Sequence, residues 1–163
     1  MTYSLQEVAF VDLAELVDET IGTGAFVERK DDTDEPFLRA IPELFGNEPG
    51  FRCLAVLADG DKPVGYVTIL PNDDSDALDI GPLYVGTQYR GRGLGRCLME
   101  GALDYARGEG VKKIHTATWG ENRRVQRLFE SLGFERIREI RDARVNGDST
   151  VEYVLRLTIR AGH

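Results

Sequence analysis

The residues best suited to chemistry form a glycine- and arginine-rich segment, Arg90-Gly91-Arg92-Gly93-Leu94-Gly95-Arg96. The segment lies between a predicted strand, Ala77–Val85, and a predicted helix. Glycines at such a junction let the backbone approach a ligand, and the start of the helix offers unpaired N–H groups and the positive end of its dipole. Arginines add charge-assisted hydrogen bonds. The segment therefore predicts an anion site that suits a diphosphate better than a carboxylate.

Other phosphate-binding motifs fit this segment poorly. A P-loop ends in Gly-Lys-Ser/Thr, which is absent here, and the dinucleotide fingerprint needs a third glycine where Arg96 stands. A nucleotide-binding protein that uses the same anion site, and a basic turn without a ligand, are the open alternatives.

Hydrophobic periodicity and turn sequences predict the elements that position the segment. Helices are expected within Leu5–Phe26, ending near Gly22 or Gly24, over about Glu35–Leu44, from the glycines to Gly108 or Gly110, and from Asn122, as N-cap, to Gly133. Strands are expected over Phe51–Ala58, Val64–Leu70, Ala77–Val85, Lys113–Trp119, Phe134–Arg144 and Thr150–Ile159, the last two turning at Asn146-Gly147. Within the third strand, Gly81-Pro82 predicts a bulge, because proline lacks a donor for the ladder. The order of elements predicts an α/β fold around one mixed sheet.

Length and composition predict one cytoplasmic domain over residues 1–163. A chain of 163 residues with 42% hydrophobic and 29% charged residues is typical of globular proteins. No apolar run approaches the ~20 residues that span a bilayer, and the N-terminal sequence does not resemble a signal peptide, so no membrane association is expected. Cys53 and Cys97 are interpreted as core thiols. With His115 and His163 they form no ligand set, so no metal is predicted.

The charges are divided unevenly along the chain. Residues 1–89 carry 18 acidic and 5 basic side chains, a net −13, whereas residues 90–141 carry 7 acidic and 12 basic ones, a net +5. The basic segment favours an anionic ligand. The acidic half would repel nucleic acid and attract a cation. Solvated surface charge without a ligand is the alternative interpretation.

At the glycine segment the sequence resembles the GNAT acyltransferases, whose signature is Arg/Gln-x-x-Gly-x-Gly/Ala. The preceding strand residues Leu83–Val85, the following helix, the strand Lys113–Trp119 and the segment Glu121–Phe134 occur in the family's order. The resemblance covers about residues 64–140 and is weak in the N-terminal third, where the family's substrate-recognition helices lie. It implies a single-domain GNAT fold, with a mixed, mostly antiparallel sheet of six to seven strands and about four helices.

The resemblance implies acetyl-CoA as co-substrate and assigns residues to it. The backbone of Leu83–Val85 would pair with the pantetheine arm as an added strand does, and the amides from Gly91 to Arg96 would hold the pyrophosphate. Asn122 would contact the pantetheine or a phosphate, with a plain N-cap as the alternative. The implied donor-binding residues are Leu83, Tyr84, Val85, Arg90, Gly91, Arg92, Gly93, Leu94, Gly95, Arg96, Asn122 and Phe129.

Two positions depart from the family's catalytic pattern. Phe129 stands where many relatives carry a tyrosine that protonates the leaving thiolate, and a phenyl ring donates no proton. Ala117 stands where some relatives place a glutamate base. Asp79, six residues before Val85, matches the catalytic glutamate of the histone-type branch and is the predicted base, directly or through water, if burial raises its pKa. His115 is the second candidate base.

The resemblance implies transfer of the acetyl group by direct attack of a neutral amine, without a covalent enzyme intermediate. The backbone N–H of Tyr84 or Val85 is the expected donor to the carbonyl oxygen, so Tyr84 joins Asp79 as a predicted catalytic residue. The acidic residues of Asp31–Glu35 and Asp73–Asp76 favour a small cationic amine or peptide N-terminus as acceptor. A catalytically silent acyl-CoA-binding module is the alternative function, and a homodimer is left open.

Overall fold

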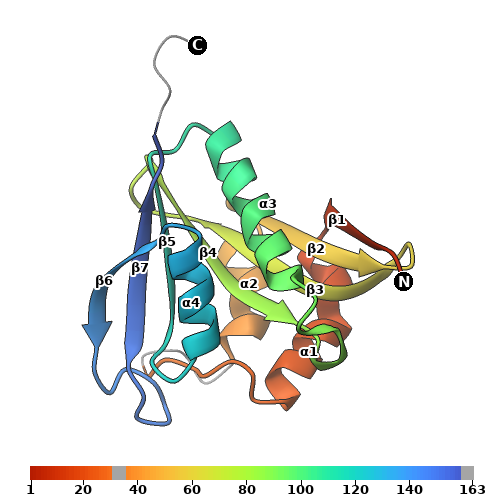
Figure 1. Ribbon diagram of the computed structural model, residues 1–163, viewed down its shortest axis with the longest axis horizontal. Helices are drawn as coiled ribbons and strands as arrows, with labels where there is room; N and C mark the ends of the chain where they lie inside the picture. Colours follow the sequence, from red (N-terminus) through yellow and green to blue (C-terminus); the bar gives the residue numbers. More distant parts are fainter. Residues whose placement is uncertain (31–35, 159–163) are drawn as a thin grey trace.

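The computed structural model describes residues 1–30 and 36–158, which build one twisted sheet with helices on both faces (Figure 1). The seven strands lie in the order β1-β2-β3-β4-β5-β7-β6. They are β1 (Tyr3–Glu7), β2 (Arg52–Ala58), β3 (Lys62–Pro71), β4 (Ala77–Val85), β5 (Lys113–Trp119), β6 (Glu135–Ile140) and β7 (Thr150–Arg156). The helices are α1 (Ala14–Gly22), α2 (Phe37–Phe45), α3 (Leu94–Gly108) and α4 (Arg123–Ser131). The predicted α/β fold with a mixed sheet is confirmed.

Each face of the sheet has its own hydrophobic core. On one face α3 and α4 cover residues such as Val67, Ile69 and Ile114, and on the other α1 and α2 cover Tyr66 and Tyr84. Because side chains alternate between the faces of a strand, neighbouring residues of β4 point into different cores. The two sides of β4 can therefore serve different ligands.

The prediction of one helix within Leu5–Phe26 is wrong at its start. Tyr3–Glu7 is a strand that pairs antiparallel with β2, with Leu5 opposite Val56, and the α-helix begins only at Ala14 after a 3₁₀ turn. The outer edge of β2 needs a hydrogen-bonding partner, and this tertiary pairing outweighs the local helical spacing. Val11, one of the apolar residues within Leu5–Phe26, is 75% exposed.

Strands β4 and β5 separate along their length. They are the one parallel pair among the described strands, and they pair only from Ala77 opposite Lys113 to Asp79 opposite His115. The predicted bulge is confirmed: the register between β3 and β4 shifts at Gly81-Pro82, opposite Thr68, whose hydroxyl donates to the Gly81 carbonyl. Beyond the bulge, β4 pairs with β3 on one side alone, so its β5-facing edge is open.

The C-terminal strands follow the prediction with a longer connection. β6 and β7 pair antiparallel, and residues 141–149 join them around the predicted turn, where Gly147 has a φ of +86°. The expected strand end at Ile159 lies outside the described residues. In the described part of the chain, no helix is long and apolar enough to cross a membrane.

Candidate active site

A cavity of about 480 Å³ opens where β4 and β5 separate. Its walls come from both faces of the sheet: Met99, Leu128 and Phe129 belong to the α3 and α4 side, and Thr20 and Phe26 to the α1 side. The size is typical of small-molecule sites. Two reactants could thus meet in the gap from opposite faces.

The glycine segment, which the sequence predicts to be an anion site, forms one end of this cavity. Gly91 and Gly93 have φ angles of +76° and +78°, and a Cβ at either position would meet no atom within 4 Å. The α3 helix begins at Leu94, and its first backbone hydrogen bond runs from Cys97 to the Gly93 carbonyl. The amides before Cys97 therefore have no partner within the helix. This open backbone fits an anionic group such as a pyrophosphate.

The arginines of the segment differ in what they contact. Arg90 and Arg96 line the cavity, but Arg90 folds back so that Nε donates to the Val85 carbonyl at 3.0 Å. The Arg92 guanidinium instead donates to the Tyr3 hydroxyl at 2.7 Å and is not among the lining residues. For Arg92, only the backbone amide stays a predicted contact to the donor.

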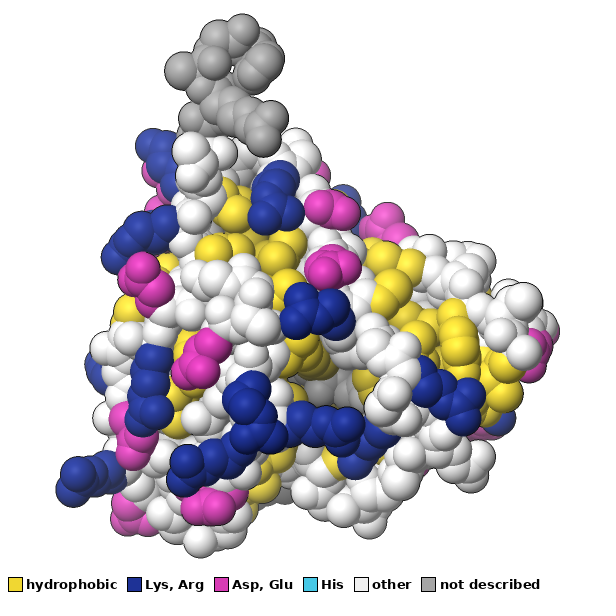
Figure 2. All heavy atoms as spheres, viewed as in Figure 1, with side chains coloured by type: hydrophobic (Ala, Val, Ile, Leu, Met, Phe, Trp, Pro, Cys, Tyr) yellow, Lys and Arg dark blue, Asp and Glu magenta, His cyan; other side chains and the backbone are white. Residues whose placement is uncertain are grey.

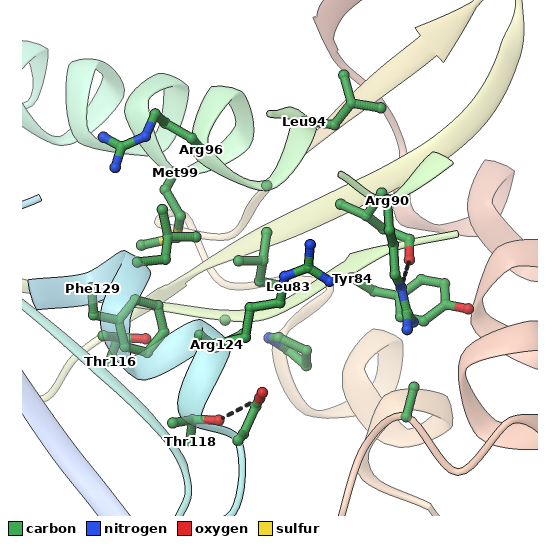
Figure 3. A pocket seen from close by; sticks show the side chains of 18 of the residues that line it. Leu83, Tyr84, Arg90, Leu94, Arg96, Met99, Thr116, Thr118, Arg124 and Phe129 are labelled. Carbon is green, nitrogen blue, oxygen red and sulfur yellow. Dashed lines mark hydrogen bonds between the residues drawn. The ribbon is translucent and has the colours of Figure 1, made fainter. Parts of the chain in front are cut away.

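The sequence reasoning missed Arg124, which lines the cavity from the first turn of α4. Figure 3 shows its guanidinium reaching across the cavity toward Leu83. In Figure 2, Lys and Arg side chains gather around a hollow on this face of the molecule. Three basic residues of the segment 90–141, Arg90, Arg96 and Arg124, thus line the cavity where an anionic ligand would enter.

The segment Leu83–Val85 lies along the open edge of β4, as the donor assignment requires. Its backbone pairs with β3 at Val67, Tyr66 and Gly65, which leaves the other edge without a strand partner, although the Val85 carbonyl there already accepts from Arg90. All three residues line the cavity. Leu83 and Val85 pack with the α3 side and Tyr84 with the α1 side.

Asn122 lies in the cavity wall but does not cap α4 with its side chain. Its side-chain amide donates to the Thr118 hydroxyl at 2.9 Å, and no capping hydrogen bond forms (Figure 3). Asn122 is thus the N-cap residue of α4 by position, and its carbonyl accepts from the Gln126 N–H, but its side chain forms no capping bond. The Asn122 side chain ties α4 to the diverging end of β5 instead, while contact with the donor stays a prediction.

Phe129 is buried in the cavity wall, 2% exposed, with its ring centroid 5.4 Å from that of Tyr153 and 5.7 Å from that of Phe134.

We expect Phe129→Tyr to leave CoA affinity intact and to raise turnover if the added hydroxyl reaches the cavity. Thermal unfolding with and without CoA, together with turnover, checks this. A loss of stability of ~2 kcal/mol without a gain in turnover would mean that the hydroxyl is buried without a partner.

Asp79 and His115 do not line this first cavity but an adjoining one of about 470 Å³ on the α2 side. The two cavities share Phe26, Ile80, Gly81, Pro82, Thr116 and Ala117. Asp79 accepts a hydrogen bond from Asn72 at 2.9 Å. Burial raises the pKa of Asp79, although the Asn72 hydrogen bond and the charge of His115 oppose the rise. The raised pKa is the property that the predicted base requires.

Aromatic residues from distant segments line the α1 side of the cavity. Phe26 packs edge-on against Trp119, with ring centroids 6.1 Å apart, and the Arg144 guanidinium lies 6.0 and 5.9 Å from the two rings. Arg144 is 2% exposed and donates to the Val27 carbonyl and the Thr150 hydroxyl. No local sequence signal could have joined these residues, because folding alone brings them together.

The acidic segments expected to attract the acceptor are less available than the sequence suggested. Asp31–Glu35 lies outside the described residues. In the turn before β4, Asp74 pairs with Lys113 at 3.2 Å and Asp76 with Lys112 at 3.6 Å. The described residues contain no group of three His, Cys, Asp or Glu side chains that could hold a metal ion.

The described sheet opens beside a glycine segment at the start of a helix, and this arrangement can be compared with known proteins. The model of the Acetyltransferase (GNAT) family matches residues 13–134, so the chain belongs to this family.

Among curated proteins, the chain is similar to the L-2,4-diaminobutyric acid acetyltransferase of Streptomyces coelicolor, with 39% identity over 50% of this chain and 50% of that protein. It is also similar to N-alpha-acetyltransferase 30 of Schizosaccharomyces pombe, with 27% identity over 76% of this chain and 84% of that protein. The match to a mycothiol acetyltransferase of Beutenbergia cavernae, 38% identical, spans 47% of this chain. The chain covers only 26% of the length of that relative.

Solved structures share the fold at low sequence identity. The ribosomal-protein-S18-alanine N-acetyltransferase of Escherichia coli superposes with a TM-score of 0.75 at 16% identity, covering 99% of this chain and 98% of that one. The yncA protein of Salmonella typhimurium, solved with its cofactor acetyl-CoA, gives 0.74 at 19% identity, covering 100% and 98%.

Proposed function

We propose that this protein is an N-acetyltransferase that uses acetyl-CoA to acetylate a primary amine. The observation that carries the proposal is the cavity that joins the glycine segment on one face of the sheet to the α1 side on the other. Bound acetyl-CoA would supply the acetyl group as a thioester. The amides around Gly93 would bind its pyrophosphate, and the open edge of Leu83–Val85 would hold its pantetheine arm in line with the gap.

The acceptor would enter from the α1 and α2 side. Asp79 is proposed as the base that takes the amine proton, directly or through water, because it lies in the adjoining cavity and burial raises its pKa. His115, its register partner on β5, is the second candidate. The backbone N–H of Tyr84 or Val85 is proposed to stabilise negative charge on the thioester carbonyl oxygen.

A small cationic amine or a peptide N-terminus is proposed as the acceptor class. The net −13 of residues 1–89 supports attraction of a cation, although two of the carboxylates in the turn before β4 already pair with lysines. A single cytoplasmic domain that binds neither nucleic acid nor membrane is proposed on the same composition, and a homodimer stays open.

The test of the activity is a thiol-release screen with acetyl-CoA across primary amines of differing charge. Saturable release that depends on the amine is expected, with an acetylated product of the matching mass. CoA binding without release for any amine would favour the alternative, a silent acyl-CoA-binding module, for which Phe129 and Ala117 are the supporting residues.

Salt tests the acceptor class separately. If exposed carboxylates attract a cationic amine, kcat/KM for the amine should fall several-fold between about 0.05 and 0.5 M salt, because exposed charges are screened over ~10 Å at 0.1 M. The value of kcat should change little, since the steering acts on capture. A neutral amine of similar shape serves as the control. Preference for an anionic amine would contradict the acceptor class but not the acetyl transfer.

A further inference from the structure

The hydroxyl of Tyr84 is buried in the hydrophobic core on the α1 and α2 side of the sheet. Over residues 1–30 and 36–158, it is the one buried side-chain nitrogen or oxygen without a hydrogen-bond partner. The residue is 4% exposed, so bulk solvent does not satisfy the group. Leaving a buried hydroxyl unpaired destabilises a protein. The Tyr84 hydroxyl therefore calls for a hydrogen-bond partner that the described residues do not supply.

The neighbours of Tyr84 hold its ring but do not use its hydroxyl. The ring centroid lies 6.0 Å from that of Tyr66, and the Arg90 guanidinium lies 5.5 Å above the ring. The Tyr66 and Thr20 hydroxyls hydrogen-bond each other at 3.0 Å, and Thr20 donates to the Leu16 carbonyl at 2.8 Å. Since the Thr20 proton is committed to Leu16, Tyr66 is the donor in the pair. Tyr66 is satisfied inside the fold, whereas Tyr84 is not.

The Tyr84 side chain lies on the acceptor side of the sheet. It packs in the α1 and α2 core, while Leu83 and Val85 pack in the other. Figure 3 shows the hydroxyl pointing away from the α3 and α4 side, toward the N-terminal helical layer. Tyr84 lines the same cavity as Thr20 and Phe26, which form its acceptor end. The backbone of Tyr84 faces the donor path, and its side chain faces the acceptor path.

We infer that the Tyr84 hydroxyl is a hydrogen-bonding partner of the acceptor amine, and this inference rests on the proposed acetyl transfer. The phenol oxygen accepts one N–H of the neutral amine, which leaves the nitrogen lone pair directed at the thioester. The second N–H is then available to the base. The arrangement selects an amine with two N–H bonds, so a primary amine is preferred over its N-methyl analogue.

The test compares Tyr84→Phe with the matched variant Tyr66→Phe. Tyr84→Phe is expected to keep or raise the melting temperature and to leave the KM for acetyl-CoA unchanged. It should lower kcat/KM for the amine about tenfold and reduce the preference for the primary over the N-methyl amine. Tyr66→Phe breaks the bond to Thr20, so it should lower the melting temperature while keeping the kinetic constants of the folded protein.

Three results would overturn the inference. The first is a kcat/KM for the amine within twofold of wild type in Tyr84→Phe, which leaves the acetyl transfer itself intact. The second is a larger loss of melting temperature in Tyr84→Phe than in Tyr66→Phe, which would show a structural partner for the hydroxyl. The third comes from a binding measurement without turnover, in which the amine is added in the presence of CoA and the change in melting temperature is recorded. Equal changes in wild type and Tyr84→Phe, or no change in either protein, would exclude the contact between the Tyr84 hydroxyl and the amine. Absence of thiol release from wild type with every amine would reject the proposed function instead.

Discussion

Replacing Gly93 with Asp is expected to abolish CoA binding while the protein remains folded. Gly93 sits at the start of α3 with a φ of +78°, and a side chain there would extend into open space in the cavity. A carboxylate at this point would occupy the pyrophosphate position and repel its charge. Wild type should gain about 2.7 kcal/mol of stability from CoA at a hundred times its dissociation constant, and the variant should gain none.

Thermal unfolding with and without CoA measures this difference, with Gly110→Asp as the matched control. Gly110 has a similar φ of +73°, a Cβ there also meets no atom within 4 Å, and the residue follows the far end of α3, outside the cavity. The control therefore carries the same backbone strain and the same added charge. Unchanged CoA affinity in Gly93→Asp, or equal losses in both variants, would contradict the donor site.

Replacing Asp79 with Asn should lower kcat by about a hundredfold or more, because removing a general base costs 10²–10⁴ in rate. CoA affinity should not change, since Asp79 lies in the adjoining cavity rather than the donor cavity. In wild type kcat should fall at acid pH as the base is protonated. Burial raises the pKa of Asp79, so this fall should occur above the usual pH range of an Asp carboxyl. The Asp79→Asn variant should lack this fall of kcat at acid pH.

Whereas kcat should fall in Asp79→Asn, the free energy of unfolding of this variant should rise. Burial in the folded protein disfavours the charged form of Asp79, so ionised Asp79 lowers the free energy of unfolding. This loss of stability is absent below the pKa that Asp79 has in the unfolded chain, and it appears as pH rises through the raised pKa of the folded protein. Asp79→Asn should therefore be more stable than wild type at neutral pH, and the advantage should vanish in acid. Asp12→Asn, at an exposed position outside both cavities, is the control. Full turnover in Asp79→Asn would reject Asp79 as the base.

The local features of the donor site could be predicted from the sequence. The strand Lys113–Trp119, the bulge at Gly81-Pro82 and the glycine segment before α3 all appear where they were expected. Each depends on residues that adjoin in the chain: an alternating pattern, a proline without an N–H, or glycines that accept a positive φ. Such patterns can be recognised in the sequence without knowledge of the tertiary contacts.

Predictions from local residue spacing were wrong where the hydrogen-bond partner of a segment lies elsewhere in the fold. The first residues follow a helical pattern, yet Tyr3–Glu7 pairs with β2 about fifty residues away in sequence. Asn122 has the residue type of an N-cap, yet its side-chain amide donates to the Thr118 hydroxyl on β5 instead of capping α4. In both cases a hydrogen bond that depends on the folded arrangement outweighs the local preference.

The sequence by itself therefore determined the family, the donor motif and most strands and helices of this protein. Only the tertiary structure decided the proposed acceptor side, because its wall joins Phe26, Trp119 and Arg144 from three segments and depends on the separation of β4 from β5. It also decided that the Tyr84 hydroxyl is buried without a partner while the Tyr66 hydroxyl has one. Two tyrosines in similar strand patterns look alike in a sequence, and burial and hydrogen bonding distinguish them only when the chain is folded.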